Sequence, residues 1–104
     1  MEVLIYQKES GDEPFTQWLD GMRDATTRRR ISKRLRRIEQ NNIGDVESVG
    51  DGVFELRLHF GAGYRIYFGS IDKEIILLLI GGDKNSQIKD IQKAKYYWQE
   101  HSQE

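Results

Sequence analysis

The segment from Phe54 to Phe68 carries the side chains of this sequence that could handle a phosphate group. Apolar and polar residues alternate on both sides of a glycine-rich turn, which predicts two neighbouring strands of a hairpin. Side chains at alternate positions of a strand point to the same face of a sheet. One face of the hairpin is then apolar. The other face is expected to present four polar side chains to solvent: Arg57, His59, Arg65 and Tyr67.

Two arginines on one sheet face suit the cleavage of RNA without a metal ion. The reaction needs a base for the 2′-hydroxyl, a cation for the charged phosphorane and an acid for the leaving 5′-oxygen. A guanidinium holds two phosphate oxygens at once, so Arg57 and Arg65 are candidates for stabilising the transition state. Lys84 follows the next strand and is a candidate for clamping phosphate or transferring a proton. Histidines titrate near neutrality, which makes His59 a proton-transfer candidate. Tyr67 could stack on a base or donate a hydrogen bond.

Each of these residues also has a purely structural interpretation. The two arginines could serve only as ion-pair partners of Glu55, of Asp83 or of the C-terminal helix. His59 could be an ordinary surface residue of a strand, and Lys84 could simply keep a loop soluble. The residue types alone leave both interpretations open.

Residues 28–37 form a second concentration of positive charge. They hold seven of the sixteen basic residues and no acidic one, and removing those charges from the net charge of −1 leaves −8 for the rest. The helical spacing of Ile31, Leu35 and Ile38 predicts that the charges cover one solvated face of a helix. Repulsion among them favours contact with a polyanion such as RNA, or with an acidic partner segment. The residues predicted to meet the RNA backbone lie opposite the apolar stripe: Arg29, Lys33 and Arg36.

The composition predicts one soluble globular domain over residues 1–104. The chain has no cysteine and two histidines, so we expect neither a disulfide framework nor a metal site, and no other cofactor. The longest apolar run, over residues 75–80, is far too short to span a bilayer, so we expect no membrane partner. No signal peptide is visible, and the expected location is the cytoplasm.

Periodicity and turn residues predict an α+β domain with the order β-α-α-β-β-β-α. The expected elements are a strand over residues 2–6, a helical hairpin over 14–41, strands over 53–60, 63–69 and 74–80, and a helix ending near 101. A loop is expected over 44–52. The strand over 74–80 is apolar on both faces, which predicts a central place beside the first strand. The final helix is expected to bury four side chains: Ile88, Ile91, Ala94 and Trp98.

Four stretches carry a resemblance to a known family: Glu55-Leu-Arg57, Gly61-x-Gly-Tyr-Arg-Ile-Tyr-Phe68, Leu77-Leu-Leu-x-Gly-Gly-Asp-Lys84 and Gln87-x-x-Asp-Ile-x-x-Ala94. Together they resemble the RelE/ParE superfamily of toxins from toxin–antitoxin modules. The closest branch is that of the HigB-like, phage-related addiction module killer proteins. With the helical hairpin, the resemblance covers nearly the whole chain.

The resemblance implies a small RelE-like fold, with a mainly antiparallel four-stranded sheet, an N-terminal helical hairpin and a C-terminal helix. It implies a ribosome-dependent mRNA endonuclease of the prokaryotic cytoplasm, whose partners are the ribosome, mRNA and a helix-turn-helix antitoxin. The expected catalytic residues are Arg57, Arg65, Lys84 and His59. The expected RNA-binding residues are Tyr67, Arg29, Lys33 and Arg36.

The sequence is also compatible with two other functions. A ParE-like toxin shares the fold but inhibits DNA gyrase without nuclease chemistry. A non-catalytic module that binds RNA or protein is the other alternative. Clustering of phosphate-handling groups on one sheet face favours the nuclease over the gyrase inhibitor.

Overall fold

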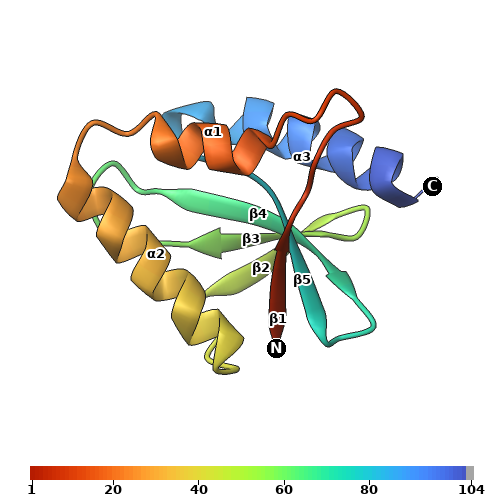
Figure 1. Ribbon diagram of the computed structural model, residues 1–104, viewed down its shortest axis with the longest axis horizontal. Coiled ribbons are helices and arrows are strands. Elements are labelled where there is room, and N and C mark those ends of the chain that lie inside the picture. Colours follow the sequence, from red (N-terminus) through yellow and green to blue (C-terminus); the bar gives the residue numbers. More distant parts are fainter. Residues whose placement is uncertain (103–104) are drawn as a thin grey trace.

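A five-stranded mixed sheet lies between two layers of helices in the computed structural model, which describes residues 1–102 (Figure 1). The elements are, in chain order, β1 (Glu2–Ile5), α1 (Pro14–Asp20), α2 (Ala25–Glu39), β2 (Val46–Gly50), β3 (Val53–Arg57), β4 (Arg65–Ile71), β5 (Ile75–Gly82), the short 3₁₀ turn η1 (Lys84–Ser86) and α3 (Gln87–Ser102). The α+β class expected from the sequence is confirmed, but the sheet has one strand more than the four expected.

The strands follow the spatial order β1-β5-β4-β3-β2. Strand β1 pairs with β5 in parallel, and the other three pairings are antiparallel. The apolar strand β5 therefore lies inside the sheet between β1 and β4, as its sequence predicts. Because β3 and β4 form a hairpin, residues that face each other across them also share a face of the sheet.

The additional strand is β2, which lies where the sequence predicted a loop. It pairs with β3 at the edge of the sheet, with an irregular register between Ser48 and Gly50. The two strands meet at a tight turn in which Asp51 and Gly52 have φ values of 56° and 83°. An Asp-Gly pair is a strong hairpin signal, because both central residues of such a turn need a left-handed backbone.

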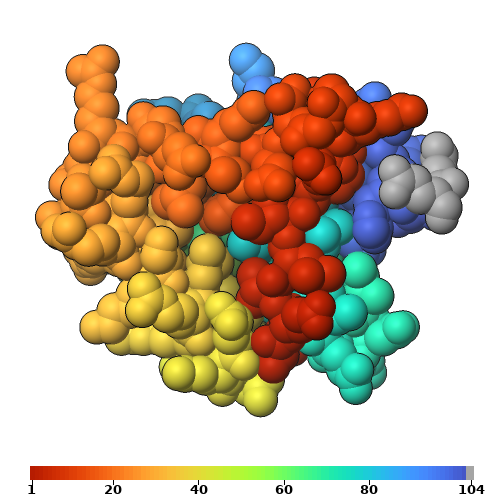
Figure 2. All heavy atoms as spheres, viewed as in Figure 1, coloured from red at the N-terminus to blue at the C-terminus, as the bar shows by residue number. Residues whose placement is uncertain are grey.

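Helices α1 and α2 cover one face of the sheet. Phe15 of α1, and Ile31 and Ile38 of α2, are fully buried there against the apolar face of β3, β4 and β5. Figure 2 shows this side of the molecule, on which β1, α1 and α2 hide most of the sheet. The expected apolar stripe of α2 is thereby confirmed. Its basic residues are left to the outer side and the flanks of the helix.

The two helices are separate, because the chain turns between Gly21 and Asp24. The Asp24 carboxylate caps α2 by accepting a hydrogen bond from the Thr26 amide at 3.0 Å. At the other end of α2, Arg34 donates to the carbonyls of Asn42 and Ile43. These contacts tie the basic helix to the loop that leads into β2.

Helix α3 covers part of the opposite face, where Ala94 packs with Val53, Leu79 and Tyr67 in a second apolar cluster. The expectation that Ile88 is buried was wrong, since Ile88 is 78% exposed. The inward side of the first turn is taken by polar residues instead. Gln87 reaches Glu55, and Asp90 is buried beside Ser86. Among residues 1–102, no helix has the length and apolar character needed to cross a membrane.

Candidate functional site

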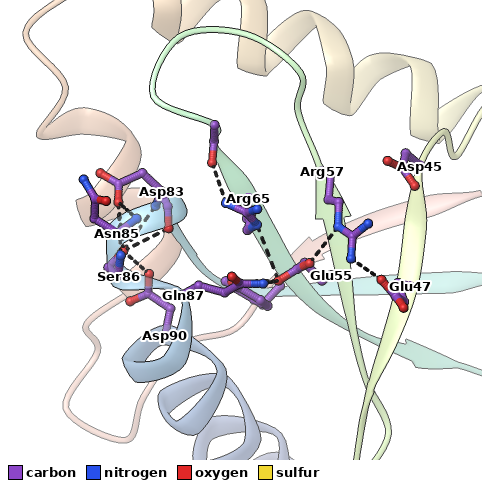
Figure 3. A network of polar contacts seen from close by, with 12 residues as sticks. Asp45, Glu47, Glu55, Arg57, Arg65, Asp83, Asn85, Ser86, Gln87 and Asp90 are labelled. Atoms are coloured by element: carbon purple, nitrogen blue, oxygen red, sulfur yellow. Dashed lines mark hydrogen bonds and ion pairs between the residues drawn. The ribbon is translucent and has the colours of Figure 1, made fainter.

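Arg57 of β3 and Arg65 of β4 are register partners, so both point to the same face of the sheet. The prediction that they share a face is confirmed. Their side chains are 37% and 15% exposed, respectively. Helix α3 begins at Gln87 and covers the part of this face nearer Val53. The two arginines lie beyond that cover, at the ends of their strands (Figure 3).

Glu55 is buried between the two arginines, with 1% of its surface exposed. Its Oε1 atom accepts a hydrogen bond from Arg57 Nε at 3.0 Å. Its Oε2 atom accepts bonds from the Tyr67 hydroxyl at 3.0 Å and from Gln87 Nε2 at 2.9 Å. Arg65 Nε lies 3.7 Å from Oε2, which is an ion pair rather than a hydrogen bond. Both arginines therefore pair with Glu55, as the structural interpretation expects, and their catalytic role stays a prediction.

This network shifts the proton affinities of its members. Burial acts to raise the pKa of Glu55, but the hydrogen bonds from Gln87, Arg57 and Tyr67 and the charge of Arg65 hold that pKa below its ordinary value. Burial, together with the negative charge of Glu55, raises the pKa of Tyr67 well above that of a free tyrosine. The hydrogen bond that Arg57 donates to Glu55 raises the pKa of Arg57. At neutral pH the group is therefore a buried carboxylate with two cations and a neutral phenol.

The expectation that Tyr67 offers its ring to a base was wrong. Tyr67 is on the predicted face, but it is fully buried in the cluster beneath α3. Alternation along a strand determines which face of the sheet a side chain is on. Whether that side chain is buried depends on where α3 packs against the face. In this structure Tyr67 supports Glu55 and does not line a groove.

Two carboxylates of the edge strand region lie against the exposed basic groups. Glu47 of β2 pairs with Arg57 Nη2, and Asp45, just before β2, lies with Oδ2 at 2.7 Å from His59 Nε2. His59 is 73% exposed and Glu47 is 59% exposed. These pairs are open to solvent, so an anionic ligand can compete for the same basic groups.

A groove of about 420 Å³ runs between α2 and the end of β3. Helix α2 lines it with four basic side chains: Arg30, Lys33, Arg34 and Arg37. Arg57 and His59 line its other side. A second hollow, of about 320 Å³, continues from Arg57 and His59 to Arg65 and the glycine turn. The two hollows share four lining residues, from Arg57 to Phe60, and we call the two together the basic groove.

The basic groove uses a different side of α2 from the one expected. Lys33 lines it as predicted, but Arg29 and Arg36 are exposed and lie outside its lining. Arg30 lines it instead, with its guanidinium 3.9 Å from the centre of the Phe60 ring. Of the three residues opposite the core stripe, only Lys33 reaches the groove. The flank of the helix is what faces the sheet.

Lys84 is exposed in the η1 turn, directly after β5. Gly63 separates it from Arg65, because a Cβ atom placed on Gly63 would lie 3.5 Å from Lys84 Cβ and 3.7 Å from Arg65 Nη1. The first side-chain carbon of Lys84 therefore lies near Arg65, but Lys84 is not among the residues that line the basic groove. In residues 1–102, no three His, Asp or Glu side chains gather as a metal-binding cluster.

No protein-family model matches the sequence. A curated protein from Haemophilus influenzae is 42% identical to this chain over 86 residues, which cover 83% of this chain and 87% of that protein. It is described as an uncharacterized protein.

Proposed function

The chain belongs to the same family as the Haemophilus influenzae protein, and we propose that it is the toxin of a type II toxin–antitoxin module. In this proposal it is a member of the RelE/ParE superfamily with a RelE-like fold. It cleaves mRNA that is bound to the ribosome, and it thereby inhibits translation in a prokaryotic cytoplasm. A helix-turn-helix antitoxin with an acidic segment holds it inactive.

The observation that carries the proposal is the Arg57–Arg65 pair in the basic groove. Arg57 lines both hollows of the groove, and Arg65 lines the hollow at the glycine turn. Cations held in a fixed position stabilise the developing charge of a phosphorane without reorganisation. A buried carboxylate with depressed pKa holds them. The site therefore suits phosphate chemistry better than recognition of a neutral ligand.

The remaining groups have roles that fit their positions. His59 is exposed beside Arg57, and Lys84 lies beside Arg65, so a proton acceptor and a proton donor can stand at opposite ends of the scissile phosphate. Arg30, Lys33 and Arg37 line the path of the backbone and contact phosphates without reading sequence. Specificity then comes largely from the ribosome, which presents the strand.

Transcript-end mapping after induction without antitoxin tests the proposal. Cells that express the parent protein should accumulate new 5′ ends within translated messages and stop growing. Arg65→Ala should abolish those ends, and Arg65→Lys should restore part of them because it keeps the charge. Arg29→Ala, outside the basic groove, is the matched control and should cleave like the parent. Intact messages together with a DNA-damage response would indicate a gyrase inhibitor and refute the proposal.

A further inference from the structure

We infer that Glu55 is a positioning residue, which grips Arg57 and Arg65 by their inner nitrogen atoms and directs the outer ends of both guanidiniums into the basic groove. Its role in phosphate cleavage rests on the function proposed above. Its role in holding the arginines does not. Glu55 is not among the residues that line the groove, so it acts through the two arginines.

The contacts of the network separate an inner side from an outer side. Both arginines approach Glu55 through Nε, at 3.0 Å for Arg57 and 3.7 Å for Arg65. The outer nitrogens turn elsewhere: Arg57 Nη2 meets the exposed Glu47, and Arg65 Nη1 donates to the Gly63 carbonyl at 3.0 Å. Figure 3 shows Glu55 between the two side chains, with Glu47 on the far side of Arg57. A guanidinium held by Nε keeps its outer edge available for a phosphate.

Glu55 itself is fixed from behind. The Tyr67 hydroxyl and Gln87 Nε2 both donate to Oε2, from β4 and from the first residue of α3. Its own strand β3, strand β4 and helix α3 therefore together determine where the carboxylate lies. Arginine side chains are long and lose much entropy when they are held in one place, so a fixed anion is an effective way to preorganise them.

Glu55 is unsuited to be the general base of the reaction. It is 1% exposed, and both of its oxygens already accept hydrogen bonds. Among the described residues, Arg65 Nε is a buried donor without a hydrogen-bond acceptor, so the ion pair at 3.7 Å is the contact that holds it. A small inward movement of Arg65 on phosphate binding would convert this contact into a hydrogen bond.

Glu47 provides a matched comparison, because it pairs with the same arginine from the opposite side. It is 59% exposed and occupies the outer nitrogen that a phosphate would use. Removing the charge of Glu47 frees the outer end of Arg57, whereas removing the charge of Glu55 releases the inner end. The same Glu→Gln change should therefore have opposite effects at the two positions.

The test compares Glu55→Gln and Glu47→Gln in the full chain by ¹⁵N NMR of the arginine Nε–H groups. In the parent, the Nε–H signal of Arg57 should be protected from exchange and rigid, and that of Arg65 should be rigid. Glu55→Gln should make both guanidiniums mobile while the backbone spectrum stays folded. Glu47→Gln should leave both Nε–H signals as in the parent. A folded Glu55→Gln protein with unchanged Nε–H signals would overturn the inference.

Single-turnover cleavage of mRNA on programmed ribosomes provides the functional readout. Glu55→Gln should lower the rate at saturating ribosome on the order of 100-fold, as expected when reacting groups are misplaced by about 1 Å. The half-saturating ribosome concentration should change little, because the net charge of the groove is not reduced. Glu47→Gln should cleave at least as fast as the parent. Parental rates in Glu55→Gln would contradict the positioning role.

Gln87→Met serves if Glu55→Gln does not fold. This change removes one hydrogen bond to Oε2 from a half-buried position on the surface of α3. It should slow cleavage about fivefold, the equivalent of one net hydrogen bond. A folded Gln87→Met protein with parental cleavage and rigid Nε–H signals would count against the inference.

The two proposals fail in different ways. If the parent cleaves no mRNA on the ribosome, the proposed function fails, and the NMR comparison still decides whether Glu55 holds the arginines. Titration with inorganic phosphate, followed on the same Nε–H signals, then provides the ligand readout. Glu55→Gln should weaken this binding and Glu47→Gln should strengthen it. Equal phosphate binding by the parent and both variants would contradict the inference.

Discussion

Arg57 and Arg65 stand directly opposite each other on adjacent strands, which places two positive charges at one cross-strand pair. Like charges in this arrangement repel and destabilise a sheet. The buried carboxylate of Glu55 offsets the repulsion by contacting both guanidiniums. Glu47 pairs with the outer nitrogen of Arg57, so two carboxylates balance the two arginines. In the proposed function, a phosphate competes with the exposed Glu47 for Arg57.

Replacing Arg57 by alanine should remove activity without removing the fold. Its side chain is 37% exposed, but its Nε also donates a hydrogen bond to the buried Glu55. We therefore expect Arg57→Ala to lower the free energy of unfolding while the protein still folds. Growth arrest after induction should be strongly reduced, because one of two transition-state cations is lost. Growth curves and circular dichroism measure the two effects. Arg36→Ala, outside the basic groove, is the control and should arrest growth like the parent.

Reversing charge on the groove side of α2 should weaken RNA binding by electrostatics alone. Lys33→Glu combined with Arg37→Glu removes two cations that line the basic groove. Binding to single-stranded RNA should weaken, and the salt dependence of log K should fall by about 1.4, from a slope of about 0.7 per phosphate contact. Titrations at several salt concentrations measure the slope.

Arg29→Glu combined with Arg36→Glu is the matched control, since it makes the same change of charge outside the groove lining. Its salt slope should remain close to the parental one. Equal losses in the two double variants would mean that α2 acts through its overall charge and not through the groove.

Neutralising Asp45 should strengthen binding of anions. Its carboxylate lies within hydrogen-bonding distance of His59, in a pair that is open to solvent. Exposed pairs of this kind contribute roughly 0.2–1 kcal/mol, so Asp45→Asn should raise affinity for a short oligoribonucleotide by up to about fivefold. Fluorescence anisotropy measures the affinity. Asp51→Asn, at the far end of the β2–β3 hairpin beside Lys95, is the control and should bind like the parent. Weaker binding by Asp45→Asn would show that Asp45 supports the site instead of competing for it.

The buried phenol of Tyr67 should make stability depend on alkaline pH. Its pKa is raised in the folded state, so its contribution is complete below the pKa of a free tyrosine, near 10. That contribution is lost as the pH rises through the folded-state pKa. At pH 7, Tyr67→Phe should lower the free energy of unfolding by about 1–3 kcal/mol, since it removes a hydrogen bond to a carboxylate. Above about pH 10 the difference from the parent should shrink.

Urea unfolding at pH 7 and at pH 10.5 measures this difference. Tyr96→Phe, on the exposed side of α3, is the control and should change stability by less than about 0.5 kcal/mol. A constant gap between the parent and Tyr67→Phe across this range would show that Tyr67 ionises as readily in the folded chain as in the unfolded one.

The sequence predicts the sheet and its faces well, because strand periodicity is local. The alternation from Phe54 to Phe68 places Arg57 and Arg65 on one face, and the apolar run of β5 predicts an interior strand. Strand β2 was not predicted, because it is a short edge strand with polar residues and an irregular register. The Asp51-Gly52 pair was the signal that could have revealed it.

Burial and groove lining depend on how elements pack, which local patterns do not encode. Glu55 and Gln87 are 32 residues apart, so the burial of Glu55 follows from the place of α3 and not from its own strand. Tyr67 is covered for the same reason. On α2, helical periodicity identifies the side opposite the core. The groove lies instead along the flank of the helix that carries Arg30.

Cleavage in a reconstituted translation system is the sharpest test of whether this protein is a ribosome-dependent nuclease. Purified protein is added to two messages that differ only in the presence of a start codon, and primer extension maps the ends that appear. We expect cuts within the translated message, none in the untranslated one, and none in either with Arg65→Ala. Equal cutting of both messages, or cutting by a folded Arg65→Ala protein at the parental rate, would contradict this expectation.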